Sequence, residues 1–570
     1  MIIKNKQFLL GMAMVALFPL SGFTQSKSGL GTTDSVKVAP HNWYQLDRAT
    51  TGYYGISLDK AYDFLKGRKS QPVIVAVIDS GVDTLHEDLK PVLWHNPGEI
   101  PGNGIDDDHN GYVDDVYGWN FIGGKDGRNL HQDSQESARL YWKLKSKYDN
   151  NPDSTKMNVD QKAEYATYLR AKDDVTNGID PVELLQYQRI LPVLEKGDSI
   201  IAKDLGKADF TGKDLQSYTP TDPYAQMAAS INLEMAKGNN AYDASNQEFL
   251  DFFRGKVRKG EAASTPPKDF RADIVKDNPN DINDRFYGNS DVMAGTPSHG
   301  THCSGIIAAV RNNNLGINGI ADNVKIMMIR AVPDGDEHDK DIANAIRYAV
   351  DNGAKVISMS FGKGFSPQKP WVDDAVKYAE SKDVLLIHAA GNDAKDVDSV
   401  QNFPNPVFED HSGVAKNFIT VGASGDATNG GFTASFSNYG KKTVDLFSPG
   451  VDIYSTLPYN KYGNYSGTSM ATPVVAGVAA IIREYFPDLS AEQVKYVIDN
   501  SVAPIKEKVI LPGTQKNVNT GGDPVMVNLS DISITGGELN AYNAVKLAST
   551  LKADKEKRLP KSKVRRRNRN

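Results

Sequence analysis

Buried-strand patterns recur along this chain and alternate with helix patterns, and this alternation restricts the fold more than any other feature. The first pattern is the β-branched run PVIVAVID at residues 72–79, which is apolar without interruption, as in a strand covered on both faces. Similar runs follow at residues 325–332, 355–360, 384–390 and 418–422, with helix-like stretches at 341–351 and 371–381. The alternation predicts an α/β fold with a doubly wound, mostly parallel sheet flanked by helices. In such sheets, functional side chains gather at the carboxyl ends of the strands.

One long part of the chain departs from this alternation. Residues 125–280 are polar and carry apolar side chains at helical spacing, as in SARLYWKLKSKY and DQKAEYATYLRAKDDV. We expect an inserted helical subdomain there, with a disordered exit at KGEAASTPPKDF. The other expected divisions are a signal peptide at 1–24, a lead-in at 25–66, two parts of the main domain at 67–124 and 281–550, and a basic disordered tail at 551–570.

The amino-terminal segment has the pattern of an export signal. Lys4 and Lys6 precede an apolar run of about 13 residues, against the roughly 20 of a membrane-spanning helix. We expect a bacterial type of signal peptide, residence in the periplasm or outside the cell, and no membrane span after cleavage. The only cysteine is Cys303, so an exported chain would hold its fold without an internal disulfide. Bound metal ions are one substitute.

The charge balance argues against a nucleic-acid partner. The chain has 65 basic and 71 acidic residues, a formal net charge of -6, and therefore no strong field. The terminal segment KADKEKRLPKSKVRRRNRN is densely basic, and its simplest interpretation is a solvated tail. Binding of an anionic surface by this tail is the alternative. The sequence leaves the oligomeric state open.

The segment NYSGTSMATPVVAGVAA at residues 464–480 places Ser469 before an apolar helical pattern. Serine is a favoured helix cap, so Ser469 is either a cap or a nucleophile. A nucleophilic serine requires a base, an acid that orients the base, and an oxyanion donor. Candidates for these roles are His299 in SHGTHCSGIIAA, Asp79 at the end of the first strand, and Asn392 in the turn AAGND.

Each of these residues also has an alternative interpretation. His299 and His302 are three positions apart and suggest a metal pair, but the H-E-x-x-H pattern is absent. Asp79 is also explained as a structural carboxylate that needs a donor, and Asn392 as a turn residue. The four contexts together favour a catalytic set at the edge of one sheet.

Five segments carry a resemblance to a known family: IVAVIDSGVDTLHEDL, SHGTHCSGIIAA, VISMSFG, AAGND and YSGTSMATPVVAGVAA. They resemble the defining segments of subtilisin-like serine peptidases, the subtilase family, and the order Asp, His, Ser matches that family. The resemblance covers about residues 73–124 and 281–545. It implies a secreted serine endopeptidase that hydrolyses peptide bonds in polypeptides through an acyl-enzyme. The alternatives are a catalytically silent scaffold that binds peptides and a calcium-dependent adhesion protein.

The resemblance also implies a role for each matching residue. Asp79 orients His299, and His299 takes the proton of Ser469 and later gives it to the leaving amine. The side-chain amide of Asn392 and the backbone N–H of Ser469 stabilise the oxyanion. No cofactor is implied for catalysis. Substrate alignment and the walls of a side-chain pocket are implied for Ser358, Ser360, Phe361, Gly362, Ala389, Ala390 and Gly391.

Cys303 follows His302 and resembles the thiol of proteinase K-like members of the family. We expect a small buried side chain there rather than a catalytic one.

The sequence also suggests bound calcium. Asp106, Asp108, Asn110 and Asp114 follow the opening of a calcium-binding loop, but Tyr117 stands where the bidentate glutamate of an EF-hand would be. A structural turn is the alternative there. The resemblance adds Asp88 and Asn313 as calcium ligands, although the loop at residues 312–319 is one residue longer than the familiar form. We expect structural calcium.

Overall fold

The structure is a computed structural model that describes residues 39–238, 241–295, 297–426, 431–515 and 522–554. The expected signal peptide at residues 1–24 lies outside the described residues, as does the expected tail from residue 555 onward. Within the described part, no helix is both long enough and apolar enough to cross a membrane.

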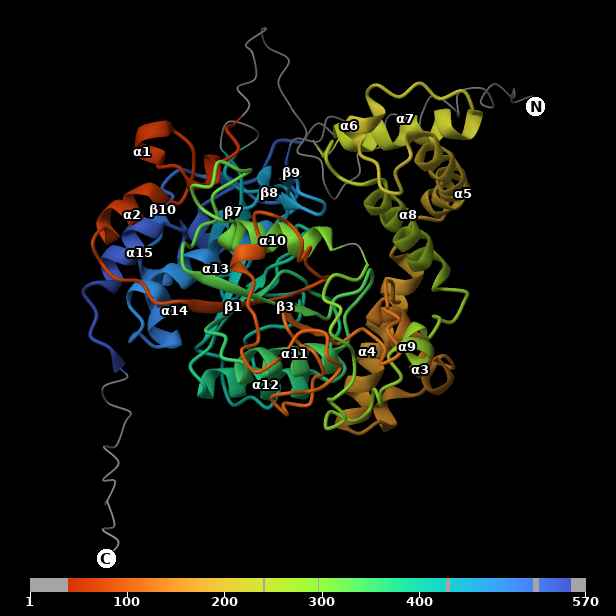
Figure 1. Cartoon of the computed structure of the whole chain (residues 1–570). Coiled ribbons are helices and arrows are strands. Elements are labelled where there is room, and N and C mark those ends of the chain that lie inside the picture. The colour runs from red at the N-terminus through yellow and green to blue at the C-terminus, as the bar shows by residue number, and fades with distance from the viewer. Residues whose placement is uncertain (1–38, 239–240, 296, 427–430, 516–521, 555–570) are drawn as a thin grey trace, which may run out of the picture.

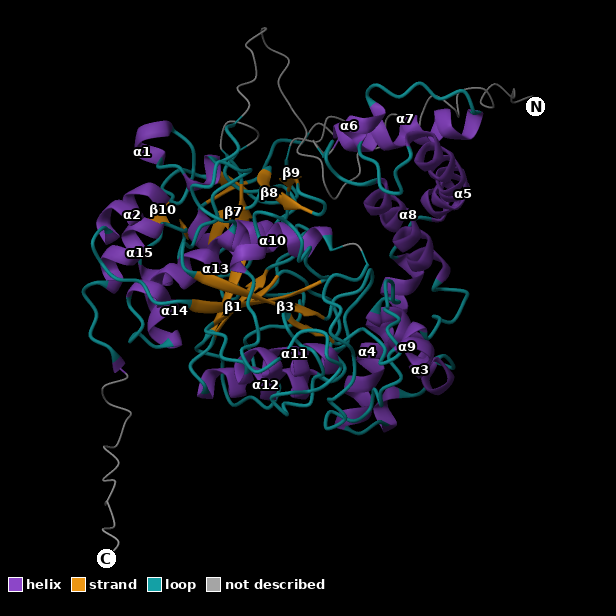
Figure 2. Cartoon of the chain, in the orientation of Figure 1, coloured by secondary structure: helices purple, strands orange, loops and turns teal. Residues whose placement is uncertain are grey.

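A nine-stranded sheet forms the centre of the molecule (Figures 1 and 2). Its strands are β1 (Val73–Asp79), β2 (Gly118–Asn120), β3 (Val324–Arg330), β4 (Val356–Met359), β5 (Leu385–Ala389), β6 (Phe418–Ser424), β7 (Leu446–Pro449), β10 (Ala503–Pro504) and β13 (Gly537–Glu538). The strand order is β10-β13-β7-β6-β5-β4-β1-β3-β2, and all neighbours are parallel except β10 and β13. The predicted mostly parallel α/β fold is confirmed.

Helices cover both faces of the sheet (Figure 1). One face packs against α2 (Leu58–Leu65), α10 (Ser298–Ala308), α13 (Thr468–Tyr485), α14 (Ala491–Asn500) and α15 (Ala541–Ala548), and the other against α11 (Asp339–Asp351) and α12 (Lys369–Ser381). Alternate residues of β1 serve the two cores. Val75 and Val77 are buried in the first core, and Ala76 and Ile78 in the second. Burial on both faces explains the uninterrupted apolar run that the sequence shows.

Smaller elements complete this part of the molecule. The short helix α1 (Arg48–Thr51) precedes α2, and the strands β11 (Val509–Ile510) and β12 (Met526–Val527) form a separate antiparallel pair. A second antiparallel pair, β8 (Ile453–Leu457) and β9 (Lys461–Tyr465), leads directly into α13. This hairpin therefore places the residues that precede Ser469.

Between β2 and α10, the described residues form seven α-helices and one short 3-10 helix (Ser154–Lys156), which lie to one side of the sheet in Figure 1. The α-helices are α3 (Glu136–Tyr148), α4 (Val159–Asn177), α5 (Pro181–Leu205), α6 (Gly212–Leu215), α7 (Pro223–Gly238), α8 (Asn246–Glu261) and α9 (Phe270–Ile274). Helices α5 to α8 share an apolar cluster of their own, whereas α3 and α4 pack together with Phe365 of the main domain. This stretch is called the insertion below.

The expected disordered exit of the insertion is not what the structure contains. Residues 259–261 form the last turn of α8, and the carbonyl of Ala262 accepts a hydrogen bond from the indole N–H of Trp142 at 2.8 Å. The polar, Pro-containing composition suggested disorder, but Trp142 of α3 supplies a packing partner that the local sequence does not reveal.

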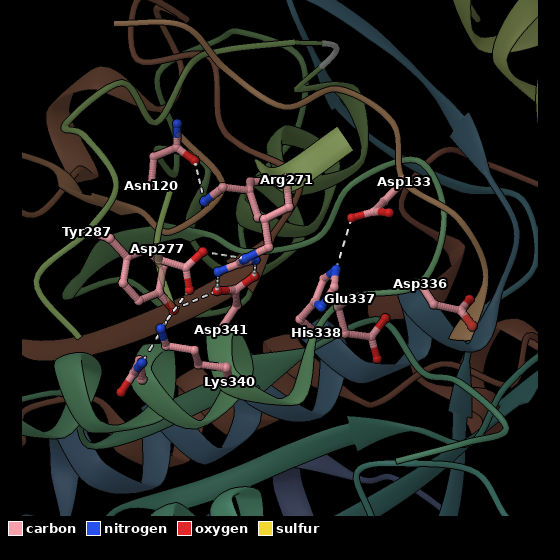
Figure 3. A network of polar contacts seen from close by, with 12 residues as sticks. Asn120, Asp133, Arg271, Asp277, Tyr287, Asp336, Glu337, His338, Lys340 and Asp341 are labelled. Carbon is pink, nitrogen blue, oxygen red and sulfur yellow. Dashed lines mark hydrogen bonds and ion pairs between the residues drawn. The ribbon is translucent and has the colours of Figure 1, made fainter. Parts of the chain in front are cut away.

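Buried ion pairs fasten the end of the insertion to α11 (Figure 3). The guanidinium of Arg271, on α9, donates to Asp341 at 2.8 Å and to Asp277 at 2.6 Å. Lys340 binds Asp277 at 2.6 Å, and the hydroxyl of Tyr287 donates to Asp341 at 2.6 Å. Each buried cation thus contacts a carboxylate, as burial of charge requires.

The start of the insertion is fastened beside β4. The ammonium group of Lys363 lies 3.0 Å from Glu136 of α3 and 2.9 Å from Asp339 of α11. Arg139 pairs with the same Glu136 at 2.7 Å. Lys363 directly follows Gly362, so α3 is anchored at the end of the candidate substrate segment.

Candidate active site

Three neighbouring strands bring candidate residues to one edge of the sheet. β1 lies beside β4, and β4 lies beside β5, all in parallel. Asp79 is the last residue of β1, Ser360 directly follows β4, and Asn392 follows β5 after a short turn. Because the carboxyl ends of parallel strands share an edge, these three residues lie where an α/β sheet normally carries its site.

Asp79 and His299 are in direct contact. The Nδ1 atom of His299 lies 2.7 Å from Oδ1 of Asp79. Gly300 allows this contact, because a Cβ there would lie 2.1 Å from the carbonyl oxygen of Gly81, so only glycine lets the first turn of α10 pack on the end of β1. The side chain of Asp79 is 2% exposed and that of His299 is 35% exposed. The carboxylate is therefore shielded, while the imidazole reaches solvent.

The two histidines of α10 have opposite electrostatic environments. Burial lowers the pKa of His299, but the charge and hydrogen bond of Asp79 and the charge of Glu248 raise it, and the net pKa is raised. Burial lowers the pKa of His302 to about 3, so its ring is neutral. Nε2 of His302 lies 3.1 Å from the carbonyl oxygen of Gly463 and therefore donates to it. This arrangement does not support a metal pair of His299 and His302.

Ser469 does not cap its helix. Gly467 is the N-cap of α13, and Ser469 is the second residue of that helix. Its hydroxyl donates to the carbonyl oxygen of Ser360 at 3.1 Å and not to His299 in the described structure. As a first-turn residue, Ser469 has a backbone N–H that lacks a partner within the helix. The cap interpretation is therefore excluded, and both the hydroxyl and the N–H lie at the sheet edge.

The amide of Asn392 is oriented by its neighbour Thr468. The backbone N–H and the hydroxyl of Thr468 both donate to Oδ1 of Asn392, each at 2.9 Å. With Oδ1 held in this way, the NH₂ group is the end of the amide that points away from Thr468. It lies close to Gly467, because a Cβ added to Gly467 would be 3.5 Å from Nδ2. Gly391 has φ of +102° and would meet Asn438 at 2.3 Å if it carried a Cβ, so the turn before Asn392 requires glycine.

The segment available to align a substrate begins at Ser360, two residues later than the sequence suggested. β4 ends at Met359, and Ser358 pairs with Val77 of β1 and Ile387 of β5 inside the sheet, so its backbone is not available to a substrate. Ser360 lies beyond the strand, and its hydroxyl donates to the carbonyl oxygen of Ser469 at 2.9 Å. Phe361 is partly buried, with its ring 6.1 Å from that of His388.

Asn402 is a residue of this site that the sequence did not indicate. Its Nδ2 donates to the carbonyl oxygen of Ala390 at 3.0 Å and to that of Ala389 at 3.3 Å. A Cβ on Gly362 would lie 2.7 Å from its Oδ1. Asn402 therefore contacts both expected pocket walls and lies between them. Its context, QNFPN, indicates only a turn.

Cys303 lies beneath the candidate catalytic residues and is fully buried. Its sulfur lies 3.5 Å from the carbonyl oxygen of Ser469. Burial, followed by the charge of Asp79, raises the pKa of the thiol well above its usual value. A protonated, buried thiol is a packing group, which agrees with the expectation for this residue.

The acidic loop contains a compact carboxylate cluster. Ligand oxygens of Glu99, Asp106 and Asp108 lie within 4.8 Å of one another. The N–H of Asn110 donates to Asp106 and Asp108, both at 3.0 Å. Asp114 is engaged elsewhere, because its carboxylate accepts the backbone N–H groups of residues 102, 103 and 104. The structure thus adds Glu99 to the expected set and separates Asp114 from it.

The other expected calcium ligands are in contact with each other. Nδ2 of Asn313 donates to Oδ1 of Asp88 at 2.7 Å, and the hydroxyl of Tyr462 donates to Oδ2 at 3.2 Å. Asp88 is fully buried.

The chain belongs to the subtilase family, whose profile matches residues 70–523, well over half of the sequence. This finding confirms the resemblance drawn from the sequence motifs.

A thermophilic serine proteinase of Bacillus sp. strain AK1 is 44% identical over 186 residues, which are 32% of this chain and 42% of the relative. Thermitase of Thermoactinomyces vulgaris is 38% identical over 38% of this chain and 71% of its own length. Subtilisin BL of Lederbergia lenta is 34% identical over 39% of this chain and 77% of its own length. The match therefore spans less than half of the first relative.

Proposed function

We propose that this protein is a serine endopeptidase that hydrolyses peptide bonds in polypeptide substrates. The observation that carries the proposal is the 2.7 Å contact between Asp79 and His299 at the sheet edge that also holds Ser469. The raised pKa of His299 further suits a general base that works near neutral pH. Membership of a family that includes proteinases agrees with this assignment.

In the proposed reaction, Ser469 Oγ attacks the scissile carbonyl carbon while Nε2 of His299 accepts the hydroxyl proton. The peptide C–N bond then breaks, and the same proton passes from His299 to the departing amine. Water then attacks the resulting ester while His299 accepts a proton from the water. His299 passes this proton to Ser469 Oγ as the ester bond breaks. Asp79 accepts the Nδ1–H bond and thereby keeps the lone pair on Nε2. The reaction requires the Ser469 hydroxyl to turn from Ser360 toward His299.

The negative oxygen of the tetrahedral intermediate would receive two hydrogen bonds. One donor is the backbone N–H of Ser469 in the first turn of α13, where the helix dipole adds stabilisation. The other is the NH₂ group of Asn392, which Thr468 holds in a fixed orientation through Oδ1. Donors that are oriented in advance stabilise charge as it forms.

The residues beyond β4 would align the substrate. An extended peptide pairs with the backbone of residues 360–362, and its side chain before the cut enters between Gly362 and Ala390, above Asn402. This arrangement uses Ser360, Phe361, Gly362, Ala389, Ala390 and Gly391 and omits Ser358.

A fluorophosphonate probe tests the proposed nucleophile directly. We expect one covalent adduct per folded chain, located on Ser469 by peptide mass spectrometry, together with digestion of casein. Heat-denatured protein is the control and should remain unlabelled. A folded protein that binds peptides but neither labels nor digests would be the silent scaffold, and labelling of another serine would overturn the assignment of Ser469.

We also propose that the loop containing Glu99, Asp106 and Asp108 binds a structural calcium ion. Three carboxylates within 4.8 Å of one another match the hard oxygen ligands that calcium prefers. Asn110 lies against the same cluster, and Asp88 with Asn313 is a second candidate. The ion would offset the repulsion between the carboxylates and stabilise the folded state.

Calcium removal is expected to lower the melting temperature. At calcium a hundredfold above Kd, the loss is about 2.7 kcal/mol of unfolding free energy. Thermal denaturation with and without EGTA measures it, and the double variant Asp106→Asn/Asp108→Asn should lose the response. The exposed Asp153→Asn is the matched control. An equal melting temperature with and without the chelator would contradict calcium binding.

A further inference from the structure

One carboxylate of the insertion contacts the main domain close to the candidate catalytic centre. Glu248 lies in the first turn of α8, and its Oε2 accepts a hydrogen bond from the hydroxyl of Tyr465 at 2.7 Å. Tyr465 is the last residue of β9, and its ring stacks on that of His302 with 4.5 Å between the centroids. His302 is one turn beyond His299 on α10. These contacts join the insertion to the helix that carries the proposed base.

Glu248 is held in this position by its own helix. Its Oε1 accepts the backbone N–H of Ser245, and its own N–H donates to the Ser245 hydroxyl, each at 3.4 Å. This capping box fixes the side chain at the start of α8. Glu248 is partly buried and lines the same small pocket as Ser298, the residue before His299. Both carboxylate oxygens thus have partners, one in the insertion and one in the main domain.

The charged and titratable groups around His299 come from several elements. Asp79 comes from β1, Glu248 from α8, and His302 and Cys303 from α10 itself. The pocket beside Ser298 adds Lys461, Asp209 and Asp243. Burial lowers the pKa of His299, and of the surrounding charges Asp79 and Glu248 raise it. His302 is neutral and Cys303 is protonated, because burial disfavours their charged forms.

We propose that Glu248 is a positioning residue that the insertion supplies to the catalytic centre. It fixes Tyr465 against His302 and places a second negative charge near His299. The inference rests on the proposed peptidase function. In consequence, docking of the insertion contributes, beside Asp79, to the pH below which the base is lost, because activity disappears as His299 becomes protonated. Removal of the charge lowers the pKa of His299 and extends activity to lower pH.

The variant Glu248→Gln tests this role with little other change. Glutamine retains an acceptor for Tyr465 and the capping box, but it carries no charge. We expect the acid limb of the kcat/KM profile to move to lower pH. The matched control is Glu183→Gln on α5, because Glu183 also accepts from a tyrosine hydroxyl, that of Tyr187, within the insertion. The control profile should coincide with that of the unmodified protein.

Two further measurements separate this inference from the proposed function. In the Ser469→Ala background, NMR titration of the Nδ1 proton of His299 reads the effect of Glu248→Gln without any turnover, and it should show a lowered pKa. Tyr465→Phe removes the hydrogen bond that holds the Glu248 carboxylate, and it should shift the acid limb of the kcat/KM profile in the same direction. An unchanged His299 titration in Glu248→Gln would overturn the inference. An altered titration, combined with no hydrolysis by the protein that retains Ser469, would instead overturn the function.

Discussion

Replacement of Ser469 by alanine should lower kcat for peptide hydrolysis by about a millionfold. The substitution removes the attacking oxygen, and water would then have to add to the carbonyl without covalent catalysis. The remaining turnover would come from the oxyanion donors and substrate alignment. KM should change little, because the hydroxyl acts in the transition state of the covalent step and not in substrate binding. Steady-state hydrolysis of a chromogenic peptide measures both constants.

Ser466→Ala is the matched control for this experiment. Ser466 lies in the same small-residue segment, and its hydroxyl accepts the backbone N–H of Asp452 at 2.9 Å, so it is structural. This variant should retain activity. Turnover by Ser469→Ala within tenfold of the unmodified protein would rule out Ser469 as the nucleophile.

Replacement of Asn392 by leucine should lower kcat by about 10²–10³-fold, roughly 2.7–4 kcal/mol of transition-state stabilisation. Leucine is similar in size but has no N–H to donate to the oxyanion. Because the donor acts on charge that develops only in the transition state, KM should stay nearly constant. Kinetics with the same peptide substrate would separate the two constants.

A second variant controls for the effect of Asn392 on folding. Leucine also deprives Thr468 of its acceptor, and an unpaired buried donor costs about 1–3 kcal/mol of stability. Asn392→Asp keeps that acceptor while it removes the NH₂ donor and places a negative charge near the oxyanion. Its kcat should fall at least as far as that of the leucine variant, with a smaller loss of stability. Unchanged kcat in both variants would contradict the oxyanion role.

The parts of the fold that sequence predicted well are those with local causes. The uninterrupted apolar run of β1 follows from burial on both faces, so the strand and its terminal Asp79 were visible in the pattern. The glycines around His299 and Asn392 are likewise local, because they permit close packing and a left-handed turn. Such local constraints can be recognised in the sequence as apolar runs and glycines.

The contacts that sequence did not predict depend on residues far apart in the chain. Helix α8 has an S-x-x-E capping signal at Ser245 and Glu248, which could have indicated its start. Nothing local indicates that Glu248 meets Tyr465, 217 positions later. The same reason explains why Asn402 was missed. Ser358 was expected in the substrate segment but lies inside β4, because an apolar run does not mark where strand pairing ends.

The insertion leaves and re-enters the main domain at one point. Asn120 and Asn289 exchange both backbone hydrogen bonds, at 2.9 and 3.1 Å, although they are 169 positions apart. The helices between β1 and β3 therefore behave as a folded insertion and not as a long flexible loop that must be closed when these two strands pair. The entropy of closure grows only with the logarithm of loop length, so such an insertion adds little to the cost of forming the sheet. A chain of this design can therefore acquire a large accessory domain between two proposed catalytic residues, Asp79 and His299, without altering the register of the strands that position them.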